Sequence, residues 1–315
     1  MSDSGPLVSV VLPTYNRPDY LTAAARAVNE QTYDRIELVV VDDHSSVPAA
    51  DVLEDVPLDS LERLTHVRHE TNKGANAARN NGIRTAEGEF VAFLDDDDQW
   101  DPHKIERQVE TFRTAGPETG VVYTWLQYCD ADGNPLNTKT PDTRGDVTYA
   151  LLTGKRVAEF SALMVRASVV EPAGLLDERF ESWQDREWLI RLSRHCEFQP
   201  VPELLTTRFM EHGDQISDDF ETKRDLSYPL LVEKHRSLAA EYGAVCERRF
   251  VAEHSRILAS SAIRNGYYAD ARRCLLRAIR LYPLSTESYL YLFASLGGRH
   301  THRIARRLKQ TVASS

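Results

Sequence analysis

Three apolar runs, each ending abruptly in polar residues, constrain the fold of this chain more than any other feature. The runs are LVSVVLP, IELVVVDD and EFVAFLDDDD, and such continuous apolar stretches are typical of strands buried on both faces. The segments 17–31 and 74–86 have helical spacing, and LTHVRHE at 64–70 predicts a shorter strand. Strands that alternate with helices at this pitch predict an α/β fold with a mostly parallel sheet and right-handed crossovers.

The strand pattern weakens in the middle of the chain and then disappears. We expect strands at 120–129, 160–166 and 204–212 and an amphipathic helix at 184–195. From about residue 220 only helical patterns remain, divided by glycine and proline. The sequence therefore predicts an α/β domain at 1–219 and an α-helical C-terminal region at 220–315.

Bulk composition argues against several classes of protein. A formal net charge of −10 argues against nucleic acid as the main partner, because phosphate binding requires a basic surface. The four cysteines form no CxxC pair, so we expect a reducing compartment and no zinc site. Neither a signal peptide nor an uninterrupted apolar run of about 18 residues is present, so we expect a cytoplasmic protein without a membrane-spanning helix. The excess of acids, with few lysines, is typical of proteins adapted to high salt.

The last stretch of the chain reverses this charge. GGRHTHRIARRLKQTVASS at 297–315 contains no acid. Its basic residues are Arg299, Arg303, Arg306, Arg307 and Lys309. Two interpretations remain open: a solvated helix end, or a contact with anionic lipid head groups at the inner face of the cell membrane.

Polar residues follow each of the three apolar runs. Thr14, Asn16 and Arg17 follow the first, Asp42 and Asp43 end the second, and four aspartates end the third. Ligands of open α/β sheets bind beyond the carboxyl ends of the strands. Each group taken singly is also explained as a turn or helix cap, but three together at one edge predict a ligand site.

The aspartate run 95–98 requires a counter-charge, because adjacent carboxylates repel one another. If the strand stays extended, Asp95 and Asp97 project together, whereas Asp96 points away and Asp98 serves the following loop. An all-oxygen pair suits Mg²⁺ or Mn²⁺, whose coordination a diphosphate would complete. A solvated acidic turn is the alternative.

The segment ETNKGANAARNNGIRTAEG suggests a second phosphate-binding element. Lys73 and Arg79 lie near the start of a predicted helix, with Gly74 allowing close backbone approach. Helix N-termini and basic side chains both favour phosphate. The alternative is that Arg79 pairs with a surface acid.

Five motifs occur in order along the chain. They are PTYNR at 13–17, VVDDHS at 40–45, NKGANAARNNGI at 72–83, GEFVAFLDDDD at 88–98 and GLLDERFESWQDREWLIRL at 174–192. Together they resemble family 2 glycosyltransferases with the GT-A fold, over roughly the first two-thirds of the chain. The resemblance implies that the domain at 1–219 has a nucleotide-binding half at 1–115 and an acceptor-binding half at 116–219.

The resemblance implies individual roles in nucleotide-sugar binding. Pro13, Tyr15 and Asp43 match positions that hold the nucleotide base, with Asp43 accepting a hydrogen bond from the base edge. Arg79 matches a nucleotide-contacting arginine. The expected nucleotide-sugar site is completed by Thr14, Asn16, Arg17, Lys73, Asp95 and Asp96. A UDP-sugar is the favoured donor, with guanosine and thymidine nucleotides as alternatives.

The resemblance also implies a metal site and a catalytic base. Asp95 and Asp97 match the DxD motif, in which Asp97 holds Mg²⁺ or Mn²⁺ directly and Asp95 reaches the ribose or a metal-bound water. His212 matches a histidine that joins the metal or diphosphate site in some members. Asp185 matches the base. Its neighbours in the expected acceptor region are Trp183, Gln184 and Trp188, and Gln184 stands where many relatives have glutamate.

These roles imply an inverting glycosyltransferase that moves a sugar to a hydroxyl of a glycan or lipid-linked saccharide. The QxxRW motif of processive synthases is missing, which favours a single addition. The alternatives are a catalytically silent sugar-nucleotide- or glycan-binding protein and, less favoured, a sugar nucleotidyltransferase, which would need a glycine-rich basic loop after the first strand. No GxGxxG motif indicates an NAD-binding domain, and a dehalogenase-type phosphatase would carry its aspartates after the first strand.

Overall fold

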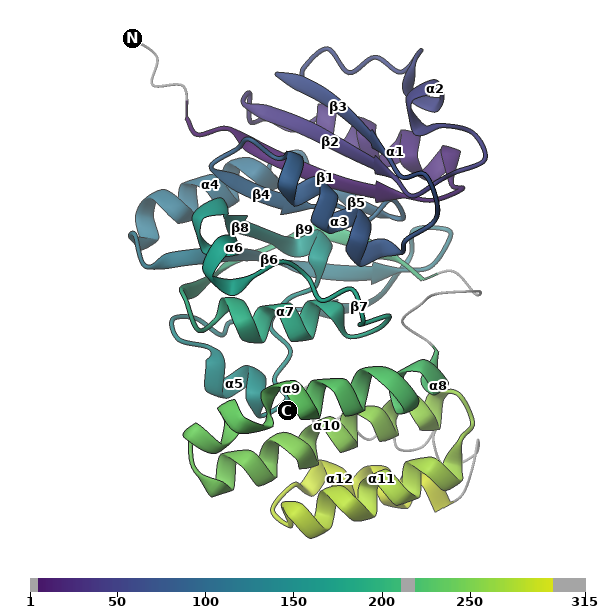
Figure 1. Cartoon of the computed structure of the whole chain (residues 1–315), viewed down its shortest axis with the longest axis vertical. Coiled ribbons are helices and arrows are strands. Elements are labelled where there is room, and N and C mark those ends of the chain that lie inside the picture. The colour runs from purple at the N-terminus through teal and green to yellow at the C-terminus, as the bar shows by residue number, and fades with distance from the viewer. Residues whose placement is uncertain (1–4, 211–218, 297–315) are drawn as a thin grey trace. The chain divides into compact units, whose positions relative to one another are not determined.

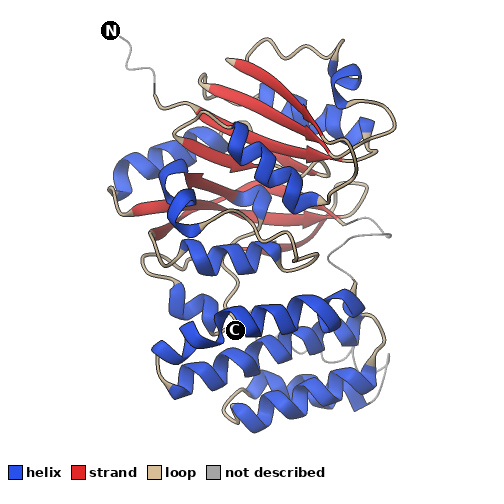
Figure 2. Cartoon of the chain, viewed as in Figure 1, coloured by secondary structure: helices blue, strands red, loops and turns tan. Residues whose placement is uncertain are grey.

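The computed structural model describes residues 5–210 and 219–296 of the chain. These residues form two compact units. Residues 5–148, 156–179 and 184–210 make up the sheet unit, and residues 149–155, 180–183 and 219–296 make up the helical unit. Figure 1 labels the elements of both units, and Figure 2 shows all strands within one sheet.

The first half of the sheet unit is parallel, as the alternating pattern predicts. Its strands are β1 (Val8–Thr14), β2 (Ile36–Asp42), β3 (Arg63–Arg68) and β4 (Phe90–Phe93), in the spatial order β3-β2-β1-β4. The connecting helices are α1 (Pro18–Asn29), α2 (Ala49–Leu53) and α3 (Ala75–Thr85). In register, Val11 of β1 lies between Val39 of β2 and Phe93 of β4. The carboxyl ends of β1, β2 and β4 therefore meet at one edge.

The second half of the sheet contains antiparallel strands, so the sheet as a whole is mixed. β8 (Leu163–Arg166) lies antiparallel between β4 and β6 (Thr119–Cys129), whereas β9 (Glu197–Phe209) is parallel to β6. The short strands β5 (Asp98–Trp100) and β7 (Pro135–Lys139) are antiparallel to β9 and β6. An apolar run carries no information on strand direction, which is set by connections to distant segments.

Helices cover both faces of the sheet (Figure 1). The main core joins Val8, Val10 and Leu12 of β1 to α1 and to α4 (Lys104–Ala115). The alternate residues Val39 and Val41 of β2 pack with α3. The remaining elements of this unit are η1 (Phe160–Ala162), α6 (Ala167–Ala173) and α7 (Gln184–Leu192). Alternation of buried side chains along β1 and β2 thus fixes which helices each face receives.

Close packing of α3 depends on a glycine. A Cβ atom on Gly82 would lie 2.3 Å from Cγ1 of Val11. Since real Cβ atoms do not approach other carbons so closely, a side chain here would push α3 away from β1. Gly82 therefore helps to hold α3, which carries Arg79, against the sheet.

The helical unit has a core of its own. It contains α9 (Tyr228–Glu241), α10 (Ala244–Arg264), α11 (Tyr268–Leu281) and α12 (Thr286–Leu296), preceded by α8 (Phe220–Thr222) and the π-helical turn η3 (Lys223–Ser227). A further helix, α5 (Thr148–Leu152), lies at the junction of the two units in sequence. Phe220, Tyr228, Leu258 and Leu275 pack together at the centre of the helical unit. Among the described residues, no helix is both long and apolar enough to cross a bilayer.

Candidate active site

The loops that follow β1 and β2 are tied to each other. Asn16 adopts a left-handed conformation with φ of 55°, which asparagine tolerates better than most residues. Its Oδ1 accepts a hydrogen bond from the backbone N–H of Ser46 at 2.7 Å, and its own N–H donates to Oγ of Ser45 at 2.9 Å. Pro13 and Thr14 are buried in β1, whereas Tyr15 is 46% exposed. The strand end is thus rigid, with Tyr15 exposed to a ligand.

Asp42 at the end of β2 holds the next loop and helix. Its Oδ1 accepts from the N–H of Ser45 at 2.7 Å, and its Oδ2 accepts from the N–H of Ala49 at 3.1 Å and from Arg68 at 2.6 Å. Burial acts to raise the pKa of Asp42, but these donors outweigh burial and lower it below 3.8. Asp42 is therefore an ionised structural anchor.

Asp43 is also buried and holds the start of α3. Its Oδ1 accepts from the N–H of Lys73 at 2.8 Å and contacts Nδ1 of His69 at 2.7 Å, and its Oδ2 accepts from the N–H of Gly74 at 2.7 Å. Since a carboxylate oxygen can accept two hydrogen bonds, Oδ2 keeps capacity for one more donor. The side chain of Lys73 is exposed.

Residues of α3 connect two of the motifs. Arg79 is buried, donates to Asp95 and lies over the ring of Phe160 at 4.1 Å from its centroid. Asn80 accepts from the N–H of Leu176 at 2.9 Å and donates to the carbonyl of Leu176 at 3.0 Å. The segment 72–83 is thereby fixed both to the aspartate run and to the segment 174–192.

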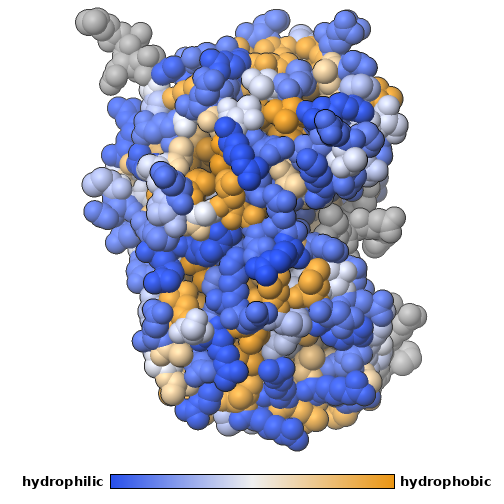
Figure 3. Space-filling view, in the orientation of Figure 1, coloured by the Kyte–Doolittle hydropathy of each residue, from blue (hydrophilic) through white to orange (hydrophobic). Residues whose placement is uncertain are grey.

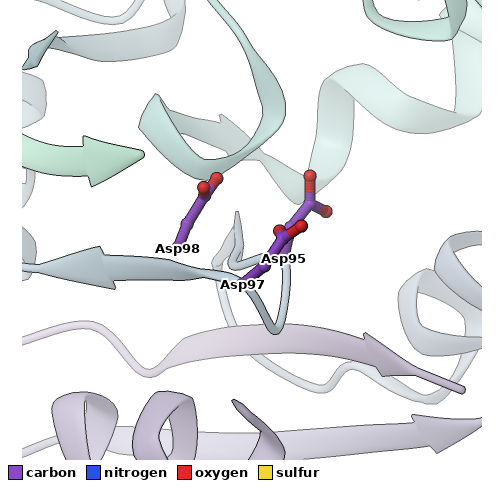
Figure 4. A group of neighbouring side chains, drawn as sticks. All are labelled: Asp95, Asp97 and Asp98. Atoms are coloured by element: carbon purple, nitrogen blue, oxygen red, sulfur yellow. The ribbon is translucent and has the colours of Figure 1, made fainter. Parts of the chain in front are cut away.

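The aspartate run forms a turn, which corrects the predicted alternation of its side chains. β4 ends at Phe93, the N–H of Asp98 donates to the carbonyl of Asp95 at 3.1 Å, and β5 begins at Asp98. Oxygens of Asp95, Asp97 and Asp98 lie within 4.8 Å of one another (Figure 4). Asp98 therefore joins the pair that the sequence predicted, because the chain turns where an extended strand was assumed. We refer to residues 95–98 as the aspartate turn.

Arginine side chains compensate the charge of the aspartate turn. Arg17 contacts Asp97 at 3.0 Å and Asp96 at 3.2 Å, and Arg79 pairs with Asp95. Thr14 donates to Asp96 at 2.8 Å. Burial nevertheless raises the pKa of Asp96 to about 6, because Thr14 and Arg17 compensate it only in part. Asp96 is thus held within the protein, whereas Asp95 and Asp97 are about a quarter exposed.

Three carboxylates in this arrangement fit a hard divalent cation. Mg²⁺ and Mn²⁺ prefer oxygen ligands and commonly take a small number of carboxylates together with phosphate oxygens. Asp95, Asp97 and Asp98 supply such oxygens. Burial raises the pKa of Asp98, while Arg208, at 3.2 Å, acts to lower it. His212, the other predicted ligand, lies outside the described residues.

A second charge network extends from Asp98, and the sequence did not predict it. Arg208 of β9 bridges Asp98 and Glu159, and Glu159 also pairs with Arg156 and accepts from the Tyr128 hydroxyl at 2.5 Å. Glu159 is buried, which acts to raise its pKa, but Arg156 and Arg208 outweigh burial and lower it. Because β6 and β9 bring these residues together across long sequence separations, no local pattern could have identified the network.

Asp185 lies in the first turn of α7. Partial burial acts to lower the pKa of Arg156, whose side chain is 53% exposed, but Glu159, Tyr128 and Asp185 outweigh it and raise that pKa above its usual value. Arg156 therefore interacts electrostatically with both Glu159 and Asp185. The network of Asp98, Arg208 and Glu159 thus extends electrostatically to Asp185.

The predicted acceptor residues occupy different environments. Gln184 begins α7 and is partly exposed. Trp183 has φ of 63° and packs on Tyr228 and His254 within the helical unit. Trp188 is fully buried, packs against Phe93 and donates from its ring N–H to the carbonyl of Gly174. Direct contact between Trp188 and an acceptor is therefore not supported, because the side chain belongs to the core.

Comparison with known proteins matches most of the sheet unit to one family. Residues 9–169 match the family described as Glycosyl transferase family 2. A Bacillus subtilis protein, provisionally named as the teichuronic acid biosynthesis glycosyltransferase TuaG, is 35% identical over 138 residues, which are 44% of this chain and 53% of that protein. An uncharacterized glycosyltransferase of Nostoc sp. (strain PCC 7120) is 32% identical over 185 residues, 56% of each chain. The chain spans about half the length of these curated relatives.

Solved structures show a similar fold. The crystal structure of S. aureus TarS 1–349 in complex with UDP-GlcNAc has a TM-score of 0.65 and 18% identity, covering 97% of this chain and 92% of that chain. Another crystal structure of S. aureus TarS 1–349 has a TM-score of 0.63 and 16% identity, covering 97% of this chain and 91% of that chain. At this identity the likeness concerns the fold: a mixed sheet with flanking helices of the GT-A type, followed by a helical region.

Proposed function

The chain belongs to glycosyl transferase family 2, and we propose that it transfers a sugar from a nucleotide-diphosphate sugar to a hydroxyl acceptor with inversion at the anomeric carbon. The observation that carries the proposal is the cluster of Asp95, Asp97 and Asp98 at the carboxyl edge of the sheet, next to the loops after β1 and β2. Ligands of open α/β sheets bind at this edge.

A UDP-sugar is the donor we propose. Support comes from the structural similarity to TarS, which was crystallised with UDP-GlcNAc and with UDP. In this chain, exposed Tyr15 would stack on the base and Oδ2 of Asp43 would accept from its edge. Lys73, Arg17 and Arg79 provide positive charge for the diphosphate, since guanidinium groups bind phosphate through paired N–H donors.

Mg²⁺ or Mn²⁺ is the proposed cofactor, held by Asp95 and Asp97 together with Asp98, and by His212 as the sequence predicts. When bound, such an ion supplies Lewis-acid stabilisation of the charge that develops on the leaving diphosphate. Arg17, which is 42% exposed, pairs with Asp97 and would turn to a phosphate oxygen, whereas buried Arg79 would stay paired with Asp95. Asp97 would thereby exchange Arg17 for the metal ion without leaving a charge uncompensated.

Asp185 is the proposed base. It accepts the proton of the acceptor hydroxyl as that oxygen forms its bond to the anomeric carbon, while the bond from that carbon to the diphosphate oxygen breaks and the diphosphate takes the electron pair. A single carboxylate on the face opposite the leaving group gives inversion. Arg156 interacts electrostatically with Asp185.

The acceptor we propose is a glycan or a lipid-linked saccharide. The name of TuaG, a relative that shares 35% identity with part of this chain, refers to teichuronic acid biosynthesis and supports this class. Cytoplasmic work at the inner membrane face would give access to such an acceptor. The remaining candidate, a catalytically silent binding protein, is disfavoured by the intact set of Asp95, Asp97 and Asp185.

A donor screen with Mn²⁺ or Mg²⁺, followed by nucleotide release and by NMR of the product anomer, tests the proposal. We expect Asp185→Asn to lower transfer by roughly 10³-fold with little change in UDP affinity, because general-base groups contribute about 10²–10⁴-fold. Asp132→Asn, at an exposed turn, is the matched control and keeps full activity. Full transfer by Asp185→Asn, or a product with retained configuration, would contradict the assignment.

A further inference from the structure

The C-terminal part of the chain departs strongly in charge from the rest. Residues 271–315 contain nine arginine and lysine residues and one acid, Glu287, although the whole chain has a formal net charge of −10. Glu287 is paired with Arg256 at 3.0 Å. Such asymmetry within one chain is typical of a segment that meets an anionic surface.

Helix α12 combines this charge with exposed apolar side chains. Leu290, Phe293 and Leu296 are 65%, 70% and 67% exposed, and Leu284 just before the helix is 78% exposed. Their spacing of three residues places Leu290, Phe293 and Leu296 on one side of α12. Apolar patches stand out among the hydrophilic side chains of the helical unit in Figure 3. Soluble surfaces usually carry such residues singly, so this grouping indicates a binding surface.

Helix α11 supplies a cationic exposed side. Arg273, Arg277 and Arg280 are exposed, together with Leu276, whereas Ala271, Leu275 and Ala278 are buried on the opposite side. The nearest acid on the helix, Asp270, pairs with Arg273 at 3.2 Å. No acidic side chain is exposed along the described length of α11. The helix therefore offers arginines and a leucine to a partner.

We propose that α11 and α12 dock on a bilayer of anionic lipids. The docking face consists of Arg273, Leu276, Arg280, Leu290, Phe293 and Leu296. Aromatic and aliphatic side chains on one side of a helix bury in the boundary between head groups and acyl chains, and arginines contact lipid phosphates. The combination favours lipid over nucleic acid, which offers phosphates without an apolar layer.

This docking deepens the proposed function by naming the surface from which a membrane-borne acceptor is reached, but it does not depend on catalysis. The basic residues between 299 and 309 continue the chain directly after α12 and add five positive charges. Each basic residue near an anionic leaflet strengthens binding by about fivefold.

Flotation of the full chain with vesicles, in the absence of any sugar nucleotide, tests the proposal. We expect binding to vesicles of phosphatidylcholine with phosphatidylglycerol, and much weaker binding to phosphatidylcholine alone. A Phe293→Ser and Leu296→Ser double variant lowers binding by about tenfold or more. A matched control changes Leu136, an exposed leucine of β7, to serine and leaves binding unchanged.

The charges are tested by the double variant Arg273→Gln and Arg280→Gln, with Arg107→Gln and Arg113→Gln, on exposed α4 positions, as the control. We expect a loss of about tenfold or more for the first pair only. The proposal is overturned if the full chain does not bind anionic vesicles. It is equally overturned if both docking-face variants bind vesicles as the wild type does while deletion of 297–315 abolishes binding. Light scattering gives a further test: the proposal is overturned if the Phe293→Ser and Leu296→Ser double variant changes the oligomeric state without changing lipid binding. It is also overturned if RNA, added at the same phosphate concentration as the lipid, displaces the protein from the vesicles.

Discussion

Two groups of aspartates follow β2 and β4, the strands on either side of β1 in the sheet, yet the protein uses them differently. At the end of β2, Asp42 and Asp43 accept mainly from backbone N–H groups of loops and helix starts. At the end of β4, the aspartate turn is balanced mainly by side chains, Arg17, Arg79 and Arg208. The difference separates an anchor, whose partners cannot leave, from a site whose partners can.

Mobility of the partner explains why similar sequences serve different purposes. A backbone N–H leaves a carboxylate only if the loop unfolds, whereas the side chain of Arg17, which is 42% exposed, can change rotamer. The partly exposed carboxylate of Asp97 can therefore exchange Arg17 for another cation. The predictions below test this distinction, from the largest expected effect to the smallest.

Replacing Asp97 by asparagine should affect activity and leave stability intact. We expect the metal-dependent transfer rate to fall by roughly 10³-fold, since a metal contributes several kcal/mol of charge stabilisation. The free energy of unfolding should change by less than about 1 kcal/mol, because the ion pair with Arg17 is partly exposed. Steady-state kinetics and urea denaturation measure the two effects. A clear loss of stability in Asp97→Asn would show instead that Asp97, like Asp42, is a structural anchor.

Replacing Asp42 by alanine should lower the stability of the protein and leave its affinity for the metal intact. The change leaves the N–H groups of Ser45 and Ala49 and the guanidinium of Arg68 without their acceptor, which should lower the free energy of unfolding by about 3 kcal/mol. Urea denaturation measures the loss. At a temperature where the variant remains folded, its affinity for Mn²⁺ should equal that of the wild type. Weaker Mn²⁺ binding would contradict the distinction between Asp42 as a structural anchor and the aspartate turn as the metal site.

Replacing Arg17 by glutamine should raise the affinity for Mn²⁺ measured without nucleotide. Arg17 competes for Asp97 at 3.0 Å, so its removal should tighten Mn²⁺ binding by about two- to fivefold. Electron paramagnetic resonance of free Mn²⁺ gives the affinity directly. Arg68→Gln removes a comparable partner from Asp42 and serves as the control, which should leave Mn²⁺ binding unchanged. Unchanged or weaker Mn²⁺ binding by Arg17→Gln would contradict the proposal that Asp97 exchanges Arg17 for the metal ion.

The pH dependence of stability gives the smallest effect. The folded-state pKa of Asp42 lies below 3.8, so its contribution is fully present above the unfolded value and is lost as pH falls through the folded value. The difference in unfolding free energy between wild type and Asp42→Asn should stay constant from about pH 8 to about pH 5 and narrow only below 3.8. A difference that changes near neutral pH would indicate another titrating group.

Local patterns were sufficient for the parallel half of the sheet. The strands β1, β2 and β4 and the helices α1 and α3 occur where buried runs and helical spacing predicted them. The helical character of the chain after residue 220 is also confirmed over the described residues 220–296. These elements depend on the periodicity of nearby side chains, which a sequence displays directly.

Features that depend on contacts between distant segments could not be predicted from local sequence patterns. Strand direction in β8 and the pairing of β5 with β9 depend on distant connections. Asp98 was assigned to the loop because the strand was assumed to stay extended past Phe93. Trp188 resembled a site residue by its motif, but only the packing of Phe93 and Phe160 shows that it is core. Glu159 had no motif at all, since its partners come from β6 and β9.

The arginine partners of the aspartate turn also determine how the protein responds when the divalent cation is removed. In small domains whose folding depends on a bound metal, such as zinc fingers, removal of the metal unfolds the chain. Here Arg17, Arg79 and Arg208 already neutralise the carboxylates. A chelator should therefore silence this protein reversibly, and a population depleted of cation should remain folded and regain full activity on resupply, without new synthesis.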